Sequence, residues 1–424
     1  MRLLIATDSF PPNCGGSGWS TYELVRGLRA RGHAVDIVRP RPGTPTSGDA
    51  EYDGFTVREL AATAPAIPYV RNYFKNERLW AQVERDLAAR LESGRYDVVH
   101  AQHVLTTVPA IRAGRRCRVP VVATVRDYWP VCYWSDLIID PDSETLCPAC
   151  TVSNMTHCVR PRARAAWPLA LPMIPYMRAN LSRKRSGLAG ASAVIAVSRA
   201  IAADLAARAP ELAGTRLERI PNPVDIGAIR HAADASAAPL AGRYVLYCGK
   251  LEINKGADLI VPVAKAAKLS CPLVIVGDGK LRGRIEADAR TAGLDVRMAG
   301  WQPRPQALAW MRHAAALVFP SRGPESLSRV LLEAGALGVP MAAMDTGGTR
   351  DIVEHERTGL LSSTAEGLAA DLGRLLGDPA LASRLGAGAQ AHVTSTFDAS
   401  VVVSKIEALY QDVTASQRSG ADRG

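Results

Sequence analysis

The chain has 424 residues, of which 47% are hydrophobic and 22% are charged, and it carries a net charge of +10. This length and balance exclude a disordered or fibrous protein and predict two or three globular domains with cores of their own. The apolar runs have the length of strands and fall far short of the roughly 18 residues that a membrane-spanning helix needs.

The first segment and the cysteines predict a cytoplasmic protein. Residues 1–8 read Met-Arg-Leu-Leu-Ile-Ala-Thr-Asp, and their apolar core is too short for a signal peptide, so we expect a buried strand. Eight cysteines spread unevenly over the chain are typical of a reducing compartment rather than of a disulfide scaffold.

Strand and helix patterns alternate in the first half, which predicts a parallel sheet covered by helices. Expected strands lie at 3–7, 34–38, 98–101, 121–125 and 193–197, with a helix at 19–30. A glycine loop, Gly15 to Gly18, opens onto this helix. Glycines let a phosphate approach the backbone, and a helix N-terminus offers N–H donors. The spacing matches neither the Walker nor the dinucleotide motif.

Two histidines stand where the strand at 98–101 ends, in the sequence Val-Val-His100-Ala-Gln-His103. The carboxyl end of a parallel strand is where ligands bind in such sheets. Both residues are therefore candidates for the acceptor side of a site, and a structural role as hydrogen-bonded core histidines is the alternative.

Four cysteines gather in one stretch, and His157 adjoins the last of them. One C-x-x-C pair with two outlying cysteines fits a tetrahedral structural zinc site around an inserted loop. Cysteine thiols that pack in a core without a metal explain the pattern as well, because a second C-x-x-C pair is missing. The four candidates are Cys132, Cys147, Cys150 and Cys158.

A basic window follows, with eight Lys and Arg residues and no acidic residue between Glu144 and Asp204. Within it, residues 167–177 are apolar and aromatic but contain three prolines, which prevent a regular spanning helix. Arginines around an exposed apolar wedge suit an anionic membrane surface, so we expect peripheral binding to the inner face of the cell membrane through residues 160–187. A solvated basic face is the alternative. Nucleic acid is not an expected partner, because no reader motif accompanies the charge.

The alternation restarts at Tyr244, which predicts a second domain at 243–397 after a first domain at 1–224. The stretch 225–242 follows a Pro-Asn-Pro sequence, is rich in alanine, and predicts a linker. Beyond the second domain, residues 398–415 show one apolar helical face, and the polar residues 416–424 predict a disordered tail.

Lys250 and Lys255 lie on a loop that begins at Gly249 and ends at Gly256, directly after the first strand of the second half. Two lysines at the carboxyl end of a strand can neutralise a diphosphate leaving group. Exposed loop lysines are the alternative, but the flanking glycines and the glycine loop in the other half favour a phosphate.

Glu325 and Glu333 have seven residues between them and follow a strand-like Ala-Ala-Leu-Val-Phe-Pro-Ser. If Glu325 ends a loop and Glu333 lies in the helix that follows, both carboxylates can reach one pocket. Ionised carboxylates accept hydrogen bonds from sugar hydroxyls. Two solvated glutamates on an amphipathic helix are the alternative, and the phosphate loops argue against it.

Four motifs therefore occur in order along the chain. They are the glycine loop at 15–18, the lysine loop at 249–256, Gly277-Asp-Gly279, and the glutamate pair. In this combination the chain resembles a family 4 glycosyltransferase with the GT-B fold. The resemblance implies two Rossmann-like doubly wound domains facing a central cleft, with the helix at 398–415 crossing back onto the first. It also implies retaining transfer of a hexose-type sugar from a nucleotide diphosphate sugar to a glycan or lipid-linked acceptor, without a catalytic metal.

The resemblance assigns roles to the motif residues. Glu333 is expected to hold the ribose hydroxyls and Glu325 to face the transferred sugar, while Lys250 and Lys255 bind the diphosphate. Pre-placed cations lower the barrier, because bond breaking leaves negative charge on the diphosphate. Backbone groups complete the expected donor site at Gly15, Gly16, Ser326, Leu327 and Ser328.

The chain departs from the family pattern at two places. Many members carry a His-Asp pair where this chain has Arg126 and Asp127, which are both catalytic candidates. Arginine is a permanent cation and cannot copy a neutral imidazole, so we expect Arg126 to bind an anionic group on the acceptor or donor sugar. A structural ion pair is the alternative. Pro223 replaces the hinge glycine. These departures keep open a non-catalytic nucleotide-sugar-binding protein, and a nucleotide-sugar epimerase of similar fold is a further alternative.

Overall fold

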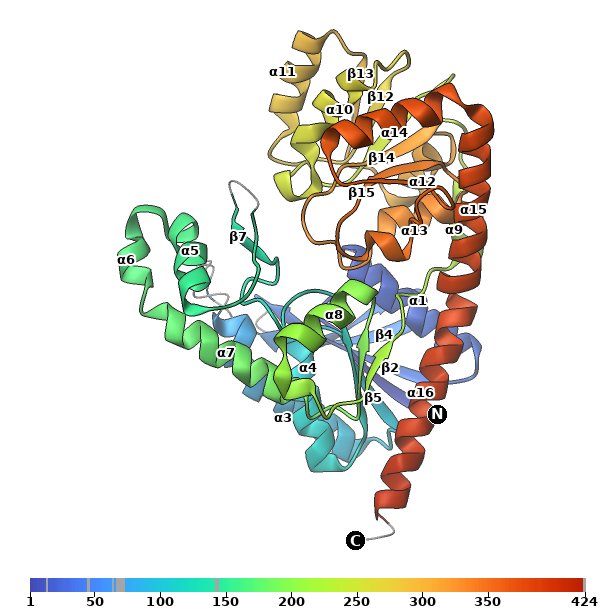
Figure 1. Cartoon of the computed structure of the whole chain (residues 1–424). Helices are drawn as coiled ribbons and strands as arrows, with labels where there is room; N and C mark the ends of the chain where they lie inside the picture. The colour runs from blue at the N-terminus through green and yellow to red at the C-terminus, as the bar shows by residue number, and fades with distance from the viewer. Residues whose placement is uncertain (13, 44–45, 63–64, 66–72, 142–144, 422–424) are drawn as a thin grey trace. The chain divides into compact units, whose positions relative to one another are not determined.

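The computed structural model describes residues 1–12, 14–43, 46–62, 65, 73–141 and 145–421. The chain forms two compact units. Unit 1 comprises residues 1–137, 147–223 and 399–424, and unit 2 comprises residues 138–146 and 224–398. Each unit contains a predominantly parallel sheet with helices packed against it (Figure 1).

The sheet of unit 1 has eight strands in the order β10-β9-β6-β5-β1-β2-β4-β3, and only the β3–β4 pair is antiparallel. The central strands are buried along their whole length, as expected for Val- and Ala-rich strands covered on both faces. The strands predicted from the sequence are confirmed. The bounds are β1 (Arg2–Ala6), β2 (Ala34–Pro42), β3 (Gly48–Tyr52), β4 (Phe55–Ala62), β5 (Val98–Ala101), β6 (Val121–Val125), β9 (Ala193–Ala196) and β10 (Leu217–Arg219).

The last helix, α16 (Ala399–Ala421), supplies part of the core of unit 1. Val402, Val403 and Tyr410 are fully buried in the cluster that contains Leu3 and Ile5 of β1. The helix also takes in residues 416–421, which were predicted to be a disordered tail. Ser416 and Ser419 donate to carbonyls one turn earlier, at 2.9 and 2.8 Å, and so satisfy their hydroxyls within the helix. Residues 422–424 lie outside the described residues.

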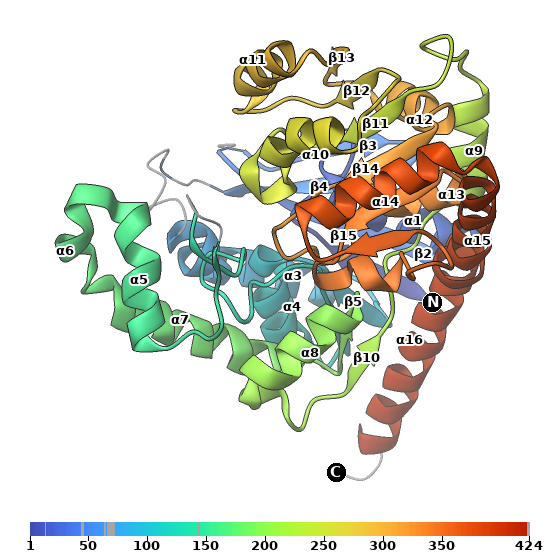
Figure 2. The same cartoon turned by 45° about the horizontal axis from the view of Figure 1, so that its top comes forward.

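The remaining helices of unit 1 include a group that the strand pattern did not predict. Between β6 and β9, three helices pack on a small core of their own around Tyr133, Met155, Ile174 and Met177. We call α5, α6 and α7 the helical arm. Figures 1 and 2 show α6 at the end of the arm farthest from the sheet. The bounds are α1 (Gly16–Ala30), α3 (Trp80–Ser93), α4 (Val104–Cys117), α5 (Val152–Ala163), α6 (Trp167–Ala170), α7 (Met173–Leu188) and α8 (Arg199–Arg208).

The sheet of unit 2 is parallel throughout, in the order β13-β12-β11-β14-β15-β16. The strand order reverses between β11 and β14, which makes their carboxyl ends the expected ligand-binding edge. The strands are β11 (Val245–Cys248), β12 (Leu273–Val276), β13 (Val296–Gly300), β14 (Ala316–Phe319), β15 (Met341–Met344) and β16 (Leu360–Ser362). The helices are α9 (Ile226–Asp234), α10 (Ile260–Ala266), α11 (Arg282–Ala292), α12 (Arg304–Arg312), α13 (Arg329–Ala336), α14 (Ala365–Gly377) and α15 (Pro379–Phe397).

Helix α9 occupies half of the stretch predicted to be a linker. Asp225 caps it, since its Oδ1 accepts the backbone N–H of Ala228 at 2.8 Å, and Ile226 and Ile229 are buried. The alanine-rich composition that indicated a linker therefore serves a short packed helix. No helix within the described ranges combines the length and the hydropathy that a membrane crossing requires.

Candidate active site

The carboxyl edge of the sheet in unit 2 carries a hollow of about 800 Å³. It lies beyond the ends of β11, β12 and β13. It is lined by glycine-containing loops, by charged side chains and by one large aromatic side chain. The lining residues are Cys248, Gly249, Lys250, Glu252, Val276, Gly277, Asp278, Gly279, Lys280, Trp301, Gln302 and Ala307.

Two glycines are required by the way these loops pack. Gly277 has φ +140°, and a Cβ there would lie 1.9 Å from the carbonyl oxygen of Gly249. Gly256 has φ +65°, and its Cβ would lie 1.9 Å from the carbonyl oxygen of Pro320. The motif glycines therefore let neighbouring loops meet backbone to backbone, which a side chain would prevent.

Lys255 and Glu325 form an ion pair at this edge. Lys255 Nζ lies 2.6 Å from Glu325 Oε1, and Ser321 Oγ donates to the same oxygen at 2.6 Å. Glu325 is only 7% exposed, whereas the lysine side chain is 37% exposed. The pair thus joins the loop after β11 to the loop after β14, while part of the lysine side chain stays exposed.

Lys250 differs from Lys255 because it is exposed and lines the hollow. Within the described part of the chain, its ammonium has no hydrogen bond or ion pair. Its charge is therefore free to act on an anion, whereas that of Lys255 is shared with a carboxylate.

Glu333 lies in α13, the helix that Ser328 caps through its Oγ. Its Oε1 accepts hydrogen bonds from Arg304 Nε at 3.1 Å and from Arg329 Nε at 3.0 Å. Neither glutamate lines the hollow directly. Glu333 is nevertheless close to it, since burial and the charge of Glu333 together raise the pKa of the Cys248 thiol to about 12.

In unit 1, the predicted glycine loop follows β1. Helix α1 begins at Gly16 with Gly15 as its cap residue, and no side chain among the described residues caps it. The N-terminal N–H groups of a helix without a side-chain cap are suitable for an anion. The role predicted for Gly15 and Gly16 in binding a diphosphate stays a prediction.

His100 and His103 are both buried, but their ring nitrogens differ. His100 Nδ1 and Nε2 lie 2.6 Å from Tyr410 Oη and from Thr124 Oγ1, so both nitrogens are used inside the core. The structural alternative fits His100. Thr7 and the backbone of Asp8 contact only Nδ1 of His103, and its Nε2 has no hydrogen-bond partner among the described residues. Burial, with a smaller contribution from Arg126, lowers the pKa of each histidine to about 3.

Arg126 is 7% exposed and donates hydrogen bonds to at least three neutral side chains. Its Nε donates to Asn222 Oδ1 at 2.7 Å, and one terminal nitrogen donates to Thr21 Oγ1 at 2.9 Å and to Gln102 Oε1. These contacts bring together segments that are distant in sequence. The anion-binding role of Arg126 stays a prediction.

Asp127 is buried directly beside Arg126 in sequence. Its Oδ1 accepts the backbone N–H of Trp129 at 2.8 Å. Burial raises the pKa of this carboxyl, while that backbone bond and the nearby Lys184 ammonium oppose the change. Its predicted catalytic role stays a prediction.

Comparison with known proteins identifies the family. The sequence profile described as Glycosyltransferase Family 4 matches residues 14–227, which is half of the chain. The profile described as Glycosyl transferases group 1 matches residues 230–392. The chain belongs to glycosyltransferase family 4.

Similar proteins match this glycosyltransferase over half or nearly all of its length. Glycogen synthase of Mycobacterium tuberculosis is 26% identical over 449 aligned residues, covering 100% of this chain and 97% of that protein. Phosphatidyl-myo-inositol mannosyltransferase of Mycobacterium leprae is 31% identical over 229 residues, 52% of this chain and 60% of that protein. The crystal structure of Anabaena HepE in complex with UDP-glucose has a TM-score of 0.64 and 19% identity, covering 97% of this chain and 100% of that one. The predicted GT-B fold, with two Rossmann-like units, is confirmed.

Several residues of the candidate site were not predicted from the sequence. Arg329 precedes Glu333 by four residues, and that helical spacing could have indicated the pair. Arg304 is 29 residues away from Glu333 and carries no such signal. Trp301, which is 73% exposed, was also missed, although a large exposed aromatic residue on the rim of a hollow is a recurrent feature of ligand sites.

The predicted zinc site needs correction. Among the described residues, no group of three or more His, Cys, Asp or Glu side chains is arranged to hold a metal ion. Arg162 donates to Cys158 Sγ at 3.1 Å and pairs with Asp136 at 2.9 Å, so a permanent cation occupies the space beside one sulfur. Burial, together with the nearby Cys132, Cys147 and Cys158, raises the pKa of the Cys150 thiol to about 12, so the four cysteines lie near one another. Cys132 and Cys147 are free thiols as well.

Proposed function

We propose that this glycosyltransferase moves a hexose-type sugar, with retention, from a nucleotide diphosphate sugar to a glycan or lipid-linked acceptor at an anionic membrane surface. The Lys255–Glu325 pair is the observation that carries the proposal. It places a cation and a carboxylate together where two loops meet at the ligand-binding edge of a doubly wound sheet. The HepE complex with UDP-glucose and the mannosyltransferase relative support the classes of donor and acceptor.

The donor is proposed to bind in the hollow of unit 2. Lys250 and Lys255 would neutralise the diphosphate as charge develops on it. Glu333, held in place by two arginines, would accept hydrogen bonds from the ribose hydroxyls, and the exposed face of Trp301 would stack on the base. Glu325 would face the transferred sugar.

The acceptor is proposed to meet residues of unit 1. His103 is the favoured contact, because its Nε2 is the ring nitrogen without a partner in the described residues. Burial keeps its ring neutral, so it can accept or donate one hydrogen bond to a hydroxyl. In a retaining transfer, the departing phosphate oxygen can take the acceptor's proton on the same face, and no protein base is then required.

The test begins with thermal denaturation in the presence of UDP-, GDP- and ADP-sugars, because a ligand that binds the folded state raises the midpoint with concentration. The stabilising donor is then used to measure transfer by Lys255→Met. We expect kcat/KM to fall about 100-fold, as when one donor to a developing oxyanion is removed. Lys265→Met, an exposed lysine on α10, is the matched control and should behave as wild type. Unchanged kinetics in Lys255→Met would contradict the proposal.

A further inference from the structure

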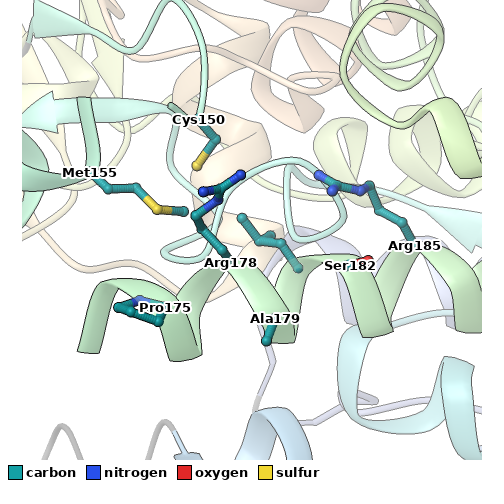
Figure 3. Close-up of a pocket in the computed structure, with 8 residues that line it drawn as sticks. Cys150, Met155, Pro175, Arg178, Ala179, Ser182 and Arg185 are labelled. Atoms are coloured by element: carbon teal, nitrogen blue, oxygen red, sulfur yellow. The ribbon is translucent and has the colours of Figure 1, made fainter. Parts of the chain in front are cut away.

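A second hollow, of 490 Å³, lies in unit 1 between the helical arm's α7 and the segment that leads into α5. Figure 3 shows the guanidinium groups of Arg178 and Arg185 on the same side of α7, pointing toward Cys150. They share this side because residues separated by seven positions lie on one face of a helix. The other lining residues are Met155, Pro175, Ala179, Leu181 and Ser182.

The two arginines of this hollow are not equally neutralised. Arg185 Nε lies 2.8 Å from Glu211 Oε2, and Ser182 donates to the other oxygen of the same carboxylate at 3.3 Å. Arg178 is exposed, and within the described residues it has neither a hydrogen bond nor an ion pair. With two guanidinium groups and one carboxylate beside it, the hollow keeps a surplus positive charge.

A third hollow, of 510 Å³, lies along the same helix but is less suited to an anion. Its arginines are largely occupied, since Arg183 pairs with Glu77 at 2.8 Å and Arg112 lies 3.7 Å from Glu84. The hollow beside Arg178 is therefore the more favourable site for a phosphate.

The outer end of the helical arm is apolar as well as basic. Leu169 on α6 is 85% exposed, and Pro168 and Pro172 beside it are exposed too. The Arg160 guanidinium lies 5.5 Å from the ring centroid of Trp167, which flanks Leu169. Arginines around a leucine and a tryptophan are the side chains that lie at the boundary between lipid headgroups and acyl chains.

We propose that the helical arm docks on an anionic phospholipid surface, with a lipid phosphate in the hollow beside Arg178 and with Leu169 inserted among the headgroups. The inference rests on the proposed function, because docking on a membrane would bring the enzyme to a lipid-linked acceptor. Charge complementarity favours a lipid, since no acidic residue occurs between Glu144 and Asp204. A guanidinium suits a phosphate through two parallel N–H donors.

The experiment measures flotation of the full-length protein with vesicles of equal parts phosphatidylglycerol and phosphatidylcholine, against vesicles of phosphatidylcholine alone. We expect binding to the anionic vesicles only, weakened about fivefold by Arg178→Gln, as for one basic residue near such a surface. Leu169→Asp should weaken it further. Arg290→Gln removes one exposed arginine from α11 of unit 2 and should bind as wild type. Equal binding to both vesicles, or equal binding by Arg178→Gln and Arg290→Gln, would overturn the proposal.

A second measurement separates a phosphate site from diffuse attraction. Glycerol 1-phosphate should release the protein from anionic vesicles at concentrations where sodium chloride of the same ionic strength does not, and Arg178→Gln should abolish that difference. Identical release by both salts would refute a site in the hollow. Stabilisation by the nucleotide sugar is followed in every variant. If the nucleotide sugar stabilises the protein but the protein does not bind anionic vesicles, the docking proposal is wrong and the donor assignment stands. If the protein binds the vesicles but no nucleotide sugar stabilises it, the docking proposal stands and the donor assignment is wrong.

Discussion

The two glutamates that first indicated a sugar site have different partners. Glu325 shares one oxygen between an ammonium and a hydroxyl, and Glu333 shares one oxygen between two guanidinium groups. Glu325 is therefore coupled to the loop that carries Lys255, whereas Glu333 is fixed on α13 by rigid planar donors. This difference in surroundings argues for different contributions to catalysis.

We expect Glu333→Ala to raise the donor KM about 10- to 100-fold with little change in kcat, because it removes charge-assisted hydrogen bonds to the bound nucleotide. Glu325→Ala should instead lower kcat more than it changes KM. Steady-state kinetics with varied donor check both, with Glu366→Ala at the exposed start of α14 as control. Wild-type donor kinetics in both variants would remove the assignment.

His100 predicts a dependence of stability on pH. Its pKa is about 3 in the folded protein, below the ordinary value of 6.5, so the unfolded state binds more protons between these values. The free energy of unfolding should therefore fall as pH drops from about 6.5 toward 3. His103 contributes in the same direction.

Urea denaturation at several pH values between 7.5 and 4 checks this expectation. His100→Gln should flatten the dependence, because a glutamine in that place does not take up a proton. The exposed His157 offers the control, and His157→Gln should keep the wild-type slope. A slope unchanged in His100→Gln would show that other groups govern the acid response.

At the scale of the element, the site depends on loops at the carboxyl ends of strands rather than on the strands themselves. The loop of Gly277 packs onto that of Gly249, and the loop of Gly256 onto Pro320, without intervening side chains. The elements that hold these loops were predictable, since β5, β6 and β14 are short runs of buried and mostly apolar residues. Helix α9 was not, because short alanine-rich segments resemble linkers until their packing is known.

Gly277→Ala should destabilise unit 2 by about 1–3 kcal/mol or more, since the new Cβ would overlap the Gly249 oxygen at a φ that L-residues avoid. Gly283→Ala is the matched control, because no atom lies within 4 Å of its Cβ position in α11. There the same substitution should stabilise by up to about 1 kcal/mol. Denaturation midpoints measure both, and equal shifts in the two variants would contradict the packing argument.

At the scale of the whole molecule, the chain returns to unit 1 after completing unit 2. Six apolar residues of α16 enter the core of unit 1, and Tyr410 also holds His100. Unit 1 therefore depends on residues more than 300 positions away in sequence. Those residues are Val402, Val403, Ile406, Leu409, Tyr410 and Val413.

Removal of residues 399–424 should unfold unit 1, because burial of each large apolar side chain contributes about 1.5–3 kcal/mol and a whole domain is stable by only about 5–15 kcal/mol. Unit 2 should remain folded and should still be stabilised by the nucleotide sugar. Calorimetry and limited proteolysis distinguish the two units. Removal of 416–424 alone, which spares the buried residues, should leave both units folded; a stable unit 1 in the longer deletion would show that α16 is dispensable.

The sequence by itself determined the family, the GT-B fold and the glycine and glutamate motifs of this glycosyltransferase. These features are local, because each has a sequence pattern that is confined to a few residues. This holds for a buried strand, for a glycine required by close loop packing and for a helix that starts after a loop. Tertiary structure alone decided the partners of the side chains. It brought Arg304 to Glu333, enclosed both nitrogens of His100, and placed Arg162 against Cys158. Such contacts join segments whose separation along the chain carries no periodic signal, so only packing could decide them.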